Sequence, residues 1–322
     1  MILRTLLVAA VLLVAMVGST ASAEPVSSDV STGPGEERLH GTLIVPDSDL
    51  PVPVAFILPG SGPTDRDGNQ PGFRQDAYRL LAEGLAGTGI ASLRIDKRGV
   101  GASKAAAPAS ESALTVDTFL SDILDWIRFL EADDRFTGVT LLGHSEGALF
   151  AILAAGEVPV SSVVLLAGLG RPAAEVIRWQ LRQLGLPAAL RDDADGILAA
   201  LAAGRTVAEP PEDLAALFRP GVQPYMTSWL AIDPAERLSR LDVPVLVLHG
   251  ETDLQVPVEE ARTLAAARDG IDLVILEDVN HILRRVASGD RAANLATYSR
   301  PDIPIADNVV PPVAAFIRRH DR

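Results

Sequence analysis

Short, continuously apolar runs recur through the middle of the chain, and longer segments with helical spacing separate them. Each run is apolar at nearly every position instead of alternating with polar residues, which is typical of strands buried on both faces. Strands that alternate with helices along the chain predict a parallel sheet covered by helices on both faces, so we expect an α/β fold. The predicted strands are VPVAFILPG (52–60), IASLRID (90–96), GVTLLG (138–143) and SSVVLLAG (161–168).

Helical patterns fill the gaps between these strands. Residues 77–89 have helical spacing and end on a glycine, and residues 116–134 carry an apolar stripe along one helix face. Upstream, LHGTLIVP (39–46) predicts an early strand, whereas residues 24–38 are polar and rich in Ser, Gly and Pro. We expect residues 24–38 to be a flexible lead-in and residues 39–168 to form the first part of the core.

The alternation of strands and helices stops after the fourth of these runs. Residues 169–235 are rich in Ala, Leu and Arg and contain no strand-like run, so we expect a helical insertion between two strands of the sheet. The sheet pattern resumes with VPVLVLHG (243–250) and IDLVILE (271–277), and a last helix is expected near 311–319. Residues 236–322 are therefore predicted to form the second part of the core.

The first 23 residues have the layout of a cleaved secretory signal peptide. Arg4 supplies one positive charge, residues 5–18 form a short apolar run, and the small residues STASA precede Glu24. The apolar run is shorter than the about 20 residues that a membrane span needs. We expect export to the periplasm or the medium, with no stable membrane insertion after cleavage; the alternative is an uncleaved N-terminal anchor.

The chain has 322 residues, a net charge of −14 and no cysteine. Its acidic residues are dispersed, which predicts a solvated anionic surface. Nucleic-acid binding is disfavoured, because it needs clustered Lys and Arg. The absence of cysteine excludes disulfides, cysteine metal ligands and a cysteine nucleophile, so the core alone must stabilise the fold.

The stretch GHSEG (143–147) matches the pattern G-x-S-x-G. A nucleophilic serine must stand clear of the backbone at the carboxyl edge of a parallel sheet, and a sharp strand-to-helix turn achieves this. Such a turn crowds its neighbours, and Gly143 and Gly147 relieve the crowding. The flanking sequences GVTLLG and ALFAILAAG predict the required strand and helix. Ser145 is therefore the candidate nucleophile; the alternative is a small residue that only fills the turn.

A serine nucleophile needs a histidine base and a carboxylate that orients it, and in this architecture they follow in the order Ser, Asp or Glu, His. Of the five histidines, His281 follows the last predicted strand, where the base is expected; otherwise it is a surface-loop histidine. The loop ETDLQVP offers Asp253 or Glu251, and we favour Asp253 because it lies further from the strand end. His144 adjoins the serine, but neighbours on such a turn are expected to point apart.

These motifs resemble the α/β-hydrolase superfamily, and more narrowly the bacterial carboxylesterases related to serine aminopeptidases and acyl-peptide hydrolases. The resemblance implies the α/β-hydrolase fold with a helical lid over residues 169–235. It also implies Ser145 as nucleophile, Asp253 as orienting acid and His281 as base. One departure is Pro59, which replaces the commoner histidine at its strand end. The resemblance is carried by LPGSGPTDRDGN (58–69), RIDKRGVGAS (94–103), GHSEG (143–147), VQPYMTSWLAIDP (222–234), GETDLQVPVEEA (250–261) and NHIL (280–283).

An oxyanion hole needs two N–H donors aimed at the developing negative oxygen. The backbone N–H of Glu146 is expected to be one. The other donor is expected in residues 60–62, the loop after the predicted strand VAFIL, which we call the oxyanion loop. The resemblance implies that Ser61 supplies it, with Gly62 as the alternative. Otherwise the oxyanion loop is a plain glycine turn. Charged residues in the loops after the strands should converge near the site. We favour an ion-pair network that holds the oxyanion loop, rather than substrate contact, for Asp65, Arg66, Asp67, Asp96 and Arg98.

Several large side chains of the predicted lid are candidates for an acyl or alcohol pocket, although each could instead pack the lid onto the core. They are Trp179, Phe218, Tyr225, Met226 and Trp229.

The sequence thus predicts an exported serine hydrolase that cleaves carboxylic esters with small to medium acyl groups through an acyl-enzyme and needs no metal or other cofactor. A peptidase or amidase with the same three residues is one alternative, because leaving-group preference depends on pocket shape. A non-catalytic binding protein with this fold is the other. The expected partner is a small-molecule ester, and the oligomeric state is left open.

Overall fold

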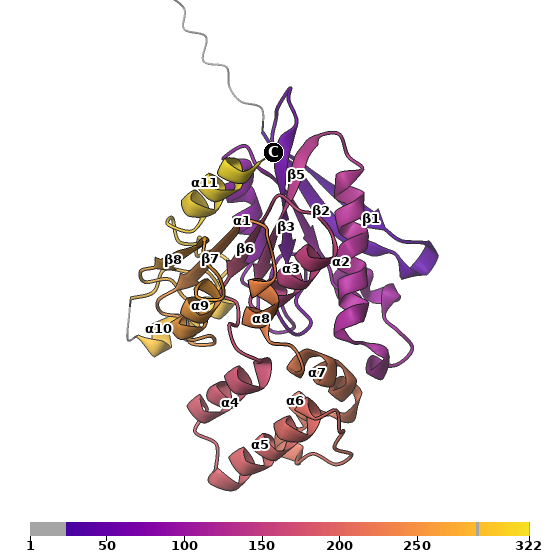
Figure 1. Cartoon of the computed structure of the whole chain (residues 1–322), viewed down its shortest axis with the longest axis vertical. Helices are drawn as coiled ribbons and strands as arrows, with labels where there is room; N and C mark the ends of the chain where they lie inside the picture. The colour runs from indigo at the N-terminus through magenta and orange to yellow at the C-terminus, as the bar shows by residue number, and fades with distance from the viewer. Residues whose placement is uncertain (1–23, 288–289, 322) are drawn as a thin grey trace, which may run out of the picture.

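The structure is a computed structural model that describes residues 24–287 and 290–321. Within these residues, eight strands form one sheet in the order β1-β2-β4-β3-β5-β6-β7-β8, which runs through the middle of the molecule (Figure 1). The strands are β1 (Val26–Thr32), β2 (Leu39–Val45), β3 (Val52–Leu58), β4 (Ala91–Ile95), β5 (Phe136–His144), β6 (Ser162–Leu166), β7 (Val245–Gly250) and β8 (Ile271–Leu276).

The sheet is parallel from β4 to β8, as the continuously apolar runs predicted. β3 pairs in parallel with β4 and β5, and β6, β7 and β8 follow in parallel pairing. Parallel strands bring their carboxyl ends to one edge of the sheet. The loops after β3, β4, β5, β7 and β8 therefore meet at this carboxyl edge, and the amino ends of the strands form the opposite, amino edge.

Residues 24–38 are not the flexible lead-in that their polar composition predicted. Val26–Thr32 forms β1, and each of its seven residues has an antiparallel partner on β2. β1 is an edge strand with mostly exposed side chains, so it needs no apolar pattern. Backbone pairing holds it in place, and backbone pairing leaves little trace in composition.

Helices cover both faces of the sheet. α1 and α11 pack on one face, whereas α2, α3, α8 and α9 pack on the other. The α-helices are α1 (Ala77–Ala86), α2 (Val116–Glu131), α3 (Glu146–Glu157), α4 (Ala173–Gln183), α5 (Ala188–Ala202), α6 (Ala215–Phe218), α7 (Gln223–Leu230), α8 (Pro234–Ser239), α9 (Val258–Ala265), α10 (Arg291–Ala296) and α11 (Val310–His320). Short 3-10 helices are η1 (Gly35–Glu37), η2 (Gly101–Ala106), η3 (Glu111–Ala113), η4 (Glu212–Leu214), η5 (Pro220–Val222) and η6 (Thr297–Ser299).

A helical insertion lies between β6 and β7, as expected. Helices α4, α5, α6 and α7 of this insertion surround an apolar cluster of their own, which includes Leu198, Phe218 and Met226. Figure 1 shows these helices as a separate layer beyond the end of the sheet where β6 runs toward α4. In contrast, α8 packs on the main core through Leu238. The insertion therefore stands on the side of the carboxyl edge.

The predicted signal peptide, residues 1–23, lies outside the described residues. Among the residues that the structure does describe, no helix combines the length and the apolar character that a membrane crossing requires.

Candidate active site

Ser145 occupies the turn between β5 and α3, at the carboxyl edge of the sheet. Its backbone has φ 55° and ψ −120°, a strained conformation that costs a non-glycine residue about 1–3 kcal/mol. A Cβ on Gly143 would lie 2.2 Å from the Gly147 carbonyl oxygen, and a Cβ on Gly147 would lie 2.3 Å from the Leu58 carbonyl oxygen. Both positions therefore require glycine, for the steric reason that the motif predicted.

A hydrogen bond joins the predicted base to the predicted acid. His281 lies in the loop after β8 and Asp253 in the loop after β7, and His281 Nδ1 lies 2.7 Å from Asp253 Oδ2. The other carboxylate oxygen accepts from the backbone N–H groups of Gln255 and Val256 at 2.7 and 2.9 Å. The Asp253 side chain is 1% exposed, whereas Glu251 is exposed. The geometry thus selects Asp253 over Glu251.

The ionisation of Asp253 is set by opposing effects. Burial alone raises the pKa of this carboxyl. The charge and hydrogen bond of His281, with smaller contributions from His249 and the Val256 N–H, outweigh burial and hold the pKa of Asp253 below its ordinary value. The ionised carboxylate accepts the Nδ1 proton of His281, so the Nε2 atom of the neutral ring is the one that can accept a proton.

Ser145 and His281 line the same cavity, which has a volume of about 250 Å³ and lies at the carboxyl edge. Gly60 and Ser61, in the loop after β3, line it as well. A Cβ on Gly60 would meet the Ser145 Cβ at 3.3 Å, so this loop packs directly against the serine. The structure therefore brings the predicted nucleophile, base and oxyanion loop around one space. Apolar parts of the lining come from Phe73, Ile282 and Tyr298.

Two backbone N–H groups are available beside Ser145. Glu146 is the first residue of α3, so its N–H has no partner within the helix. Among the described residues, neither this N–H nor that of Ser61 donates to a backbone carbonyl. The dipole of α3 adds positive potential at the same place. Ser61 lines the cavity and Gly62 does not, which favours Ser61 as the second donor.

Hydrogen bonds to the backbone N–H and to the carbonyl of Gly60 fix the loop that carries Ser61. The Gly60 N–H donates to the Tyr78 hydroxyl at 3.0 Å, and the Gly60 carbonyl accepts from Lys97 Nζ at 2.7 Å. Tyr78 belongs to α1 and Lys97 follows β4, so two elements of the core fix this loop. The sequence analysis gave neither side chain this role, because the contacts depend on the folded sheet.

His144 links the loop of the base to the oxyanion loop. Its Nε2–H donates to the His281 carbonyl at 2.8 Å, so Nδ1 is the acceptor, and the Tyr78 hydroxyl donates to it at 2.8 Å. Burial, with the adjacent His281, lowers the pKa of His144 to about 3, so the ring is neutral. The expectation that neighbours on the turn point apart misses this role, because His144 also lines the cavity.

The Glu146 side chain connects the turn to the insertion. It is 4% exposed; its Oε1 accepts from the Tyr225 hydroxyl at 2.8 Å, and its Oε2 lies 3.9 Å from Lys97 Nζ. Burial raises the pKa of Glu146, against the opposing effects of Lys97 and the Tyr225 hydrogen bond. Tyr225 belongs to α7, so this carboxylate is a direct contact between the insertion and the serine turn.

Four of the five charged loop residues form ion pairs, as predicted, whereas Asp65 departs from the prediction and Arg98 pairs outside the loops. Asp96 accepts from Arg66 Nε and Nη2 at 3.0 and 2.8 Å, which ties the loop after β3 to that after β4. Arg98 instead pairs with Asp122 on α2, so it anchors its own loop to a helix. The other two members are Asp67, which pairs with Arg94, and Asp65, which accepts from backbone N–H groups of its own loop.

The insertion residues expected to form a substrate pocket are not among the described residues that line the cavity beside Ser145. Phe218 and Met226 are buried in the insertion's own apolar cluster, and Trp229 packs against that cluster. The Tyr225 hydroxyl donates a hydrogen bond to Glu146, and Trp179 is half-buried on α4. The physical reason for Phe218 and Met226 is that the insertion needs an apolar core of its own, and both side chains are buried in it.

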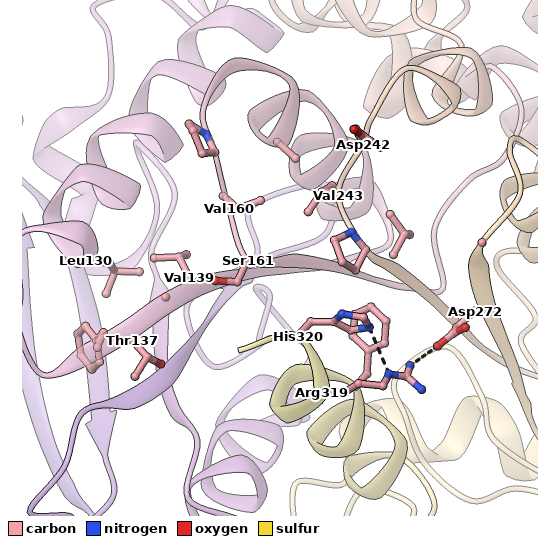
Figure 2. Close-up of a pocket in the computed structure, with 18 of the residues that line it drawn as sticks. Leu130, Thr137, Val139, Val160, Ser161, Asp242, Val243, Asp272, Arg319 and His320 are labelled. Atoms are coloured by element: carbon pink, nitrogen blue, oxygen red, sulfur yellow. Dashed lines mark hydrogen bonds and ion pairs between the residues drawn. The ribbon is translucent and has the colours of Figure 1, made fainter. Parts of the chain in front are cut away.

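A larger cavity, of about 1040 Å³, lies at the amino edge of the sheet. Figure 2 shows it beside the beginnings of the strands and the end of α11, where Arg319 reaches Asp272 of β8. Its lining includes Thr137 at the start of β5 and Ser161 just before β6, but not Ser145. The larger cavity is therefore separate from the candidate residues Ser145 and His281, which lie at the opposite edge.

Comparisons with known proteins agree with this architecture. The profile of the Alpha/beta hydrolase family matches residues 54–296. Esterase EstD of Thermotoga maritima is 28% identical over 252 residues, which are 76% of this chain and 58% of the esterase, so the chain spans less than two thirds of that relative. The structure of the Pyrococcus furiosus esterase Pf2001 matches with a TM-score of 0.59 at 17% sequence identity, and the match covers 92% of each chain. An esterase domain of a Rhodothermus marinus protein has a TM-score of 0.55 at 21% identity, with 92% of this chain and 99% of that domain covered. This chain belongs to the alpha/beta hydrolase family.

Proposed function

We propose that this protein is a serine hydrolase that cleaves carboxylic esters, with Ser145, Asp253 and His281 as its catalytic triad. The observation that carries the proposal is the 2.7 Å hydrogen bond from His281 to the buried Asp253, in a loop that brings His281 to the cavity lined by Ser145. The similarity to proteins named as esterases supports an ester as the substrate.

The proposed reaction has two halves that use the same groups. In the first, His281 Nε2 accepts the Ser145 hydroxyl proton while the Ser145 oxygen attacks the ester carbonyl, and the N–H groups of Ser61 and Glu146 bind the developing negative oxygen. The protonated His281 then donates to the leaving alcohol, which leaves an acyl-enzyme. In the second half, His281 activates water to release the acid. Asp253 fixes the His281 tautomer and stabilises its imidazolium form throughout.

The size of the cavity supports short acyl groups as substrates. Its volume of about 250 Å³ is below the range of about 300–1,000 Å³ that is usual for sites of drug-sized ligands. We expect p-nitrophenyl acetate and butyrate to be turned over with a higher kcat/KM than the octanoate and longer esters. Aminoacyl p-nitroanilides are the comparison substrates, and faster turnover of the anilides would favour a peptidase. Absence of turnover of all these substrates by the folded protein would favour a binding protein.

The arrangement of residues 1–23 supports export through a cleaved signal peptide. Arg4, the apolar run of residues 5–18 and the small residues before Glu24 carry this part of the proposal. Expression of the full chain in a bacterial host, followed by N-terminal sequencing of the exported protein, should give a mature form that begins at Glu24. Recovery of only the uncleaved chain in the membrane fraction would identify the segment as an anchor.

A further inference from the structure

Lys97 is a buried cation that lies against the oxyanion loop. It lies two residues after β4, which ends at Ile95, and is one of only two lysines in the chain. Its side chain is 11% exposed, and its Nζ donates to the Gly60 carbonyl at 2.7 Å. The proposed triad gives Lys97 no part, so the reason for burying its charge lies elsewhere.

The hydrogen bond from Lys97 determines the direction of a neighbouring N–H group. In a trans peptide unit the carbonyl oxygen and the following N–H point in opposite directions. The unit that begins with the Gly60 carbonyl contains the Ser61 N–H, so Lys97 fixes both groups at once. Gly60 has unusual backbone freedom because it lacks a Cβ, and without a partner its carbonyl could rotate. The Tyr78 hydroxyl fixes the other side of Gly60 by accepting its N–H.

Glu146 keeps the buried charge of Lys97 compensated. Burial lowers the pKa of Lys97, and the nearby carboxylate of Glu146 opposes that shift. Glu146 Oε2 lies 3.9 Å from Lys97 Nζ, and the backbone N–H of Glu146 is the first donor of the proposed oxyanion hole. The charge pair between Lys97 and Glu146 therefore links the two donors of the proposed oxyanion hole. Glu146 carries the first donor, and Lys97 binds the peptide unit that contains the second, the Ser61 N–H.

We infer that Lys97 is a positioning residue of the oxyanion hole, which orients the Gly60–Ser61 peptide unit so that the Ser61 N–H faces the negative oxygen of the transition state. This inference rests on the proposed ester hydrolysis. Lys97 touches neither the substrate nor Ser145 in this role; it acts through one backbone carbonyl. The Lys97 hydrogen bond is needed most in the transition state, so its loss lowers kcat more than it raises KM.

The test replaces Lys97 with methionine, which has a similar length but neither charge nor donor. Removal of one oxyanion donor outright costs about 10²–10³-fold in kcat, and loss of its positioning should cost roughly 10- to 100-fold, with KM changed less than about threefold. A trifluoromethyl ketone, which forms a serine-bound oxyanion, should bind more weakly by the same factor as kcat/KM falls. Lys104→Met is the matched control, because Lys104 is exposed and should leave both values unchanged.

The double variant Lys97→Met with Glu146→Gln separates positioning from loss of a buried ion pair. It removes both charges, so no uncompensated carboxylate remains even where Lys97→Met alone fails to fold. The inference predicts that the double variant loses kcat as Lys97→Met does, whereas Glu146→Gln alone, which keeps the donor, loses less. Wild-type kcat and ketone affinity in a folded variant without Lys97 would overturn the inference. A wild-type protein that hydrolyses no ester would instead overturn the proposed function.

Discussion

The two edges of the sheet each hold a cavity, and the cavities differ in what surrounds them. The amino-edge cavity is about four times larger, at about 1040 against about 250 Å³. Its charged side chains, such as Arg319 and Asp272, are half-exposed and pair with each other at the surface (Figure 2). The carboxyl-edge cavity is lined by His144 and His281, and the Asp253 carboxylate that orients His281 is almost completely buried.

The difference gives a physical reason to place the proposed chemistry at the carboxyl edge, where the polar groups are buried and orient one another, and not in the larger cavity. A half-exposed ion pair contributes little to stability and can rearrange at little cost. A buried polar group must keep its partners, so its geometry is held before any substrate arrives. At the carboxyl edge the hydrogen bonds run from Gly60 through Tyr78 and His144 to His281. Such preorganisation is the condition for electrostatic stabilisation of a transition state.

The largest effect that this comparison predicts belongs to Asp253. In Asp253→Asn the amide can donate to His281 Nδ1, which moves the ring proton to Nε2 and prevents it from accepting the Ser145 proton. We expect kcat/KM for p-nitrophenyl butyrate to fall by about 10⁴-fold with the fold retained. Glu251→Gln is the control, because that carboxylate is exposed, and its kcat/KM should stay within twofold. Equal losses in the two variants would contradict the assignment of Asp253.

The next effect concerns His144 and the stability of the fold at low pH. The pKa of His144 is lowered to about 3 in the folded protein and is about 6.5 when unfolded. Between these two pH values His144 is protonated in the unfolded state and neutral in the folded state. The free energy of unfolding therefore decreases as the pH falls below about 6.5. The slope is up to about 1.4 kcal/mol per pH unit.

Urea unfolding between pH 6.5 and 4.5 measures this slope. In His144→Gln the amide can keep one donor and one acceptor but cannot titrate. The number of protons taken up on unfolding should therefore be lower than in the wild type by about one, which makes the slope of the unfolding free energy against pH smaller. The lowered pKa of Asp253 acts in the same direction at lower pH and is common to both proteins. Identical slopes for the wild type and His144→Gln would show that His144 does not titrate between the folded and unfolded states.

The smallest effect is expected at the amino edge. Arg319→Ala removes the half-exposed ion pair with Asp272, and such pairs contribute about 0–1 kcal/mol. We expect kcat/KM to stay within twofold and the free energy of unfolding to change by less than about 1 kcal/mol. A tenfold loss of kcat/KM in this variant would mean that the larger cavity serves the reaction, and the contrast between the two edges would fail.

The sequence predicted those features that depend on local pattern. Continuously apolar runs indicated the parallel strands, and the glycines around Ser145 indicated a turn whose packing excludes side chains. Asp253 is the candidate acid by its position after a strand, and the structure adds its burial and its hydrogen bond with His281. His281 is the candidate base by chain order, and its catalytic role stays a prediction.

The features that the sequence did not predict depend on contacts between distant segments. Lys97 lies 37 residues from Gly60, and His144 lies 137 residues from the carbonyl that it binds, so no short pattern contains either pair. Strand β1 is held by backbone pairing at an exposed edge, which leaves no apolar signal. The large side chains of the insertion were ambiguous, because a pocket wall and a packed core use the same residue types, and Phe218 and Met226 belong to the core of the insertion.

The most direct test of the central claim is covalent labelling with a fluorophosphonate probe, followed by mass spectrometry of the digested protein. If Ser145 is the nucleophile, the folded wild type incorporates one probe per chain on the peptide that contains Ser145. Ser145→Ala, with an unchanged circular dichroism spectrum, incorporates none. No labelling of the folded wild type, or labelling that persists in Ser145→Ala, would contradict the account.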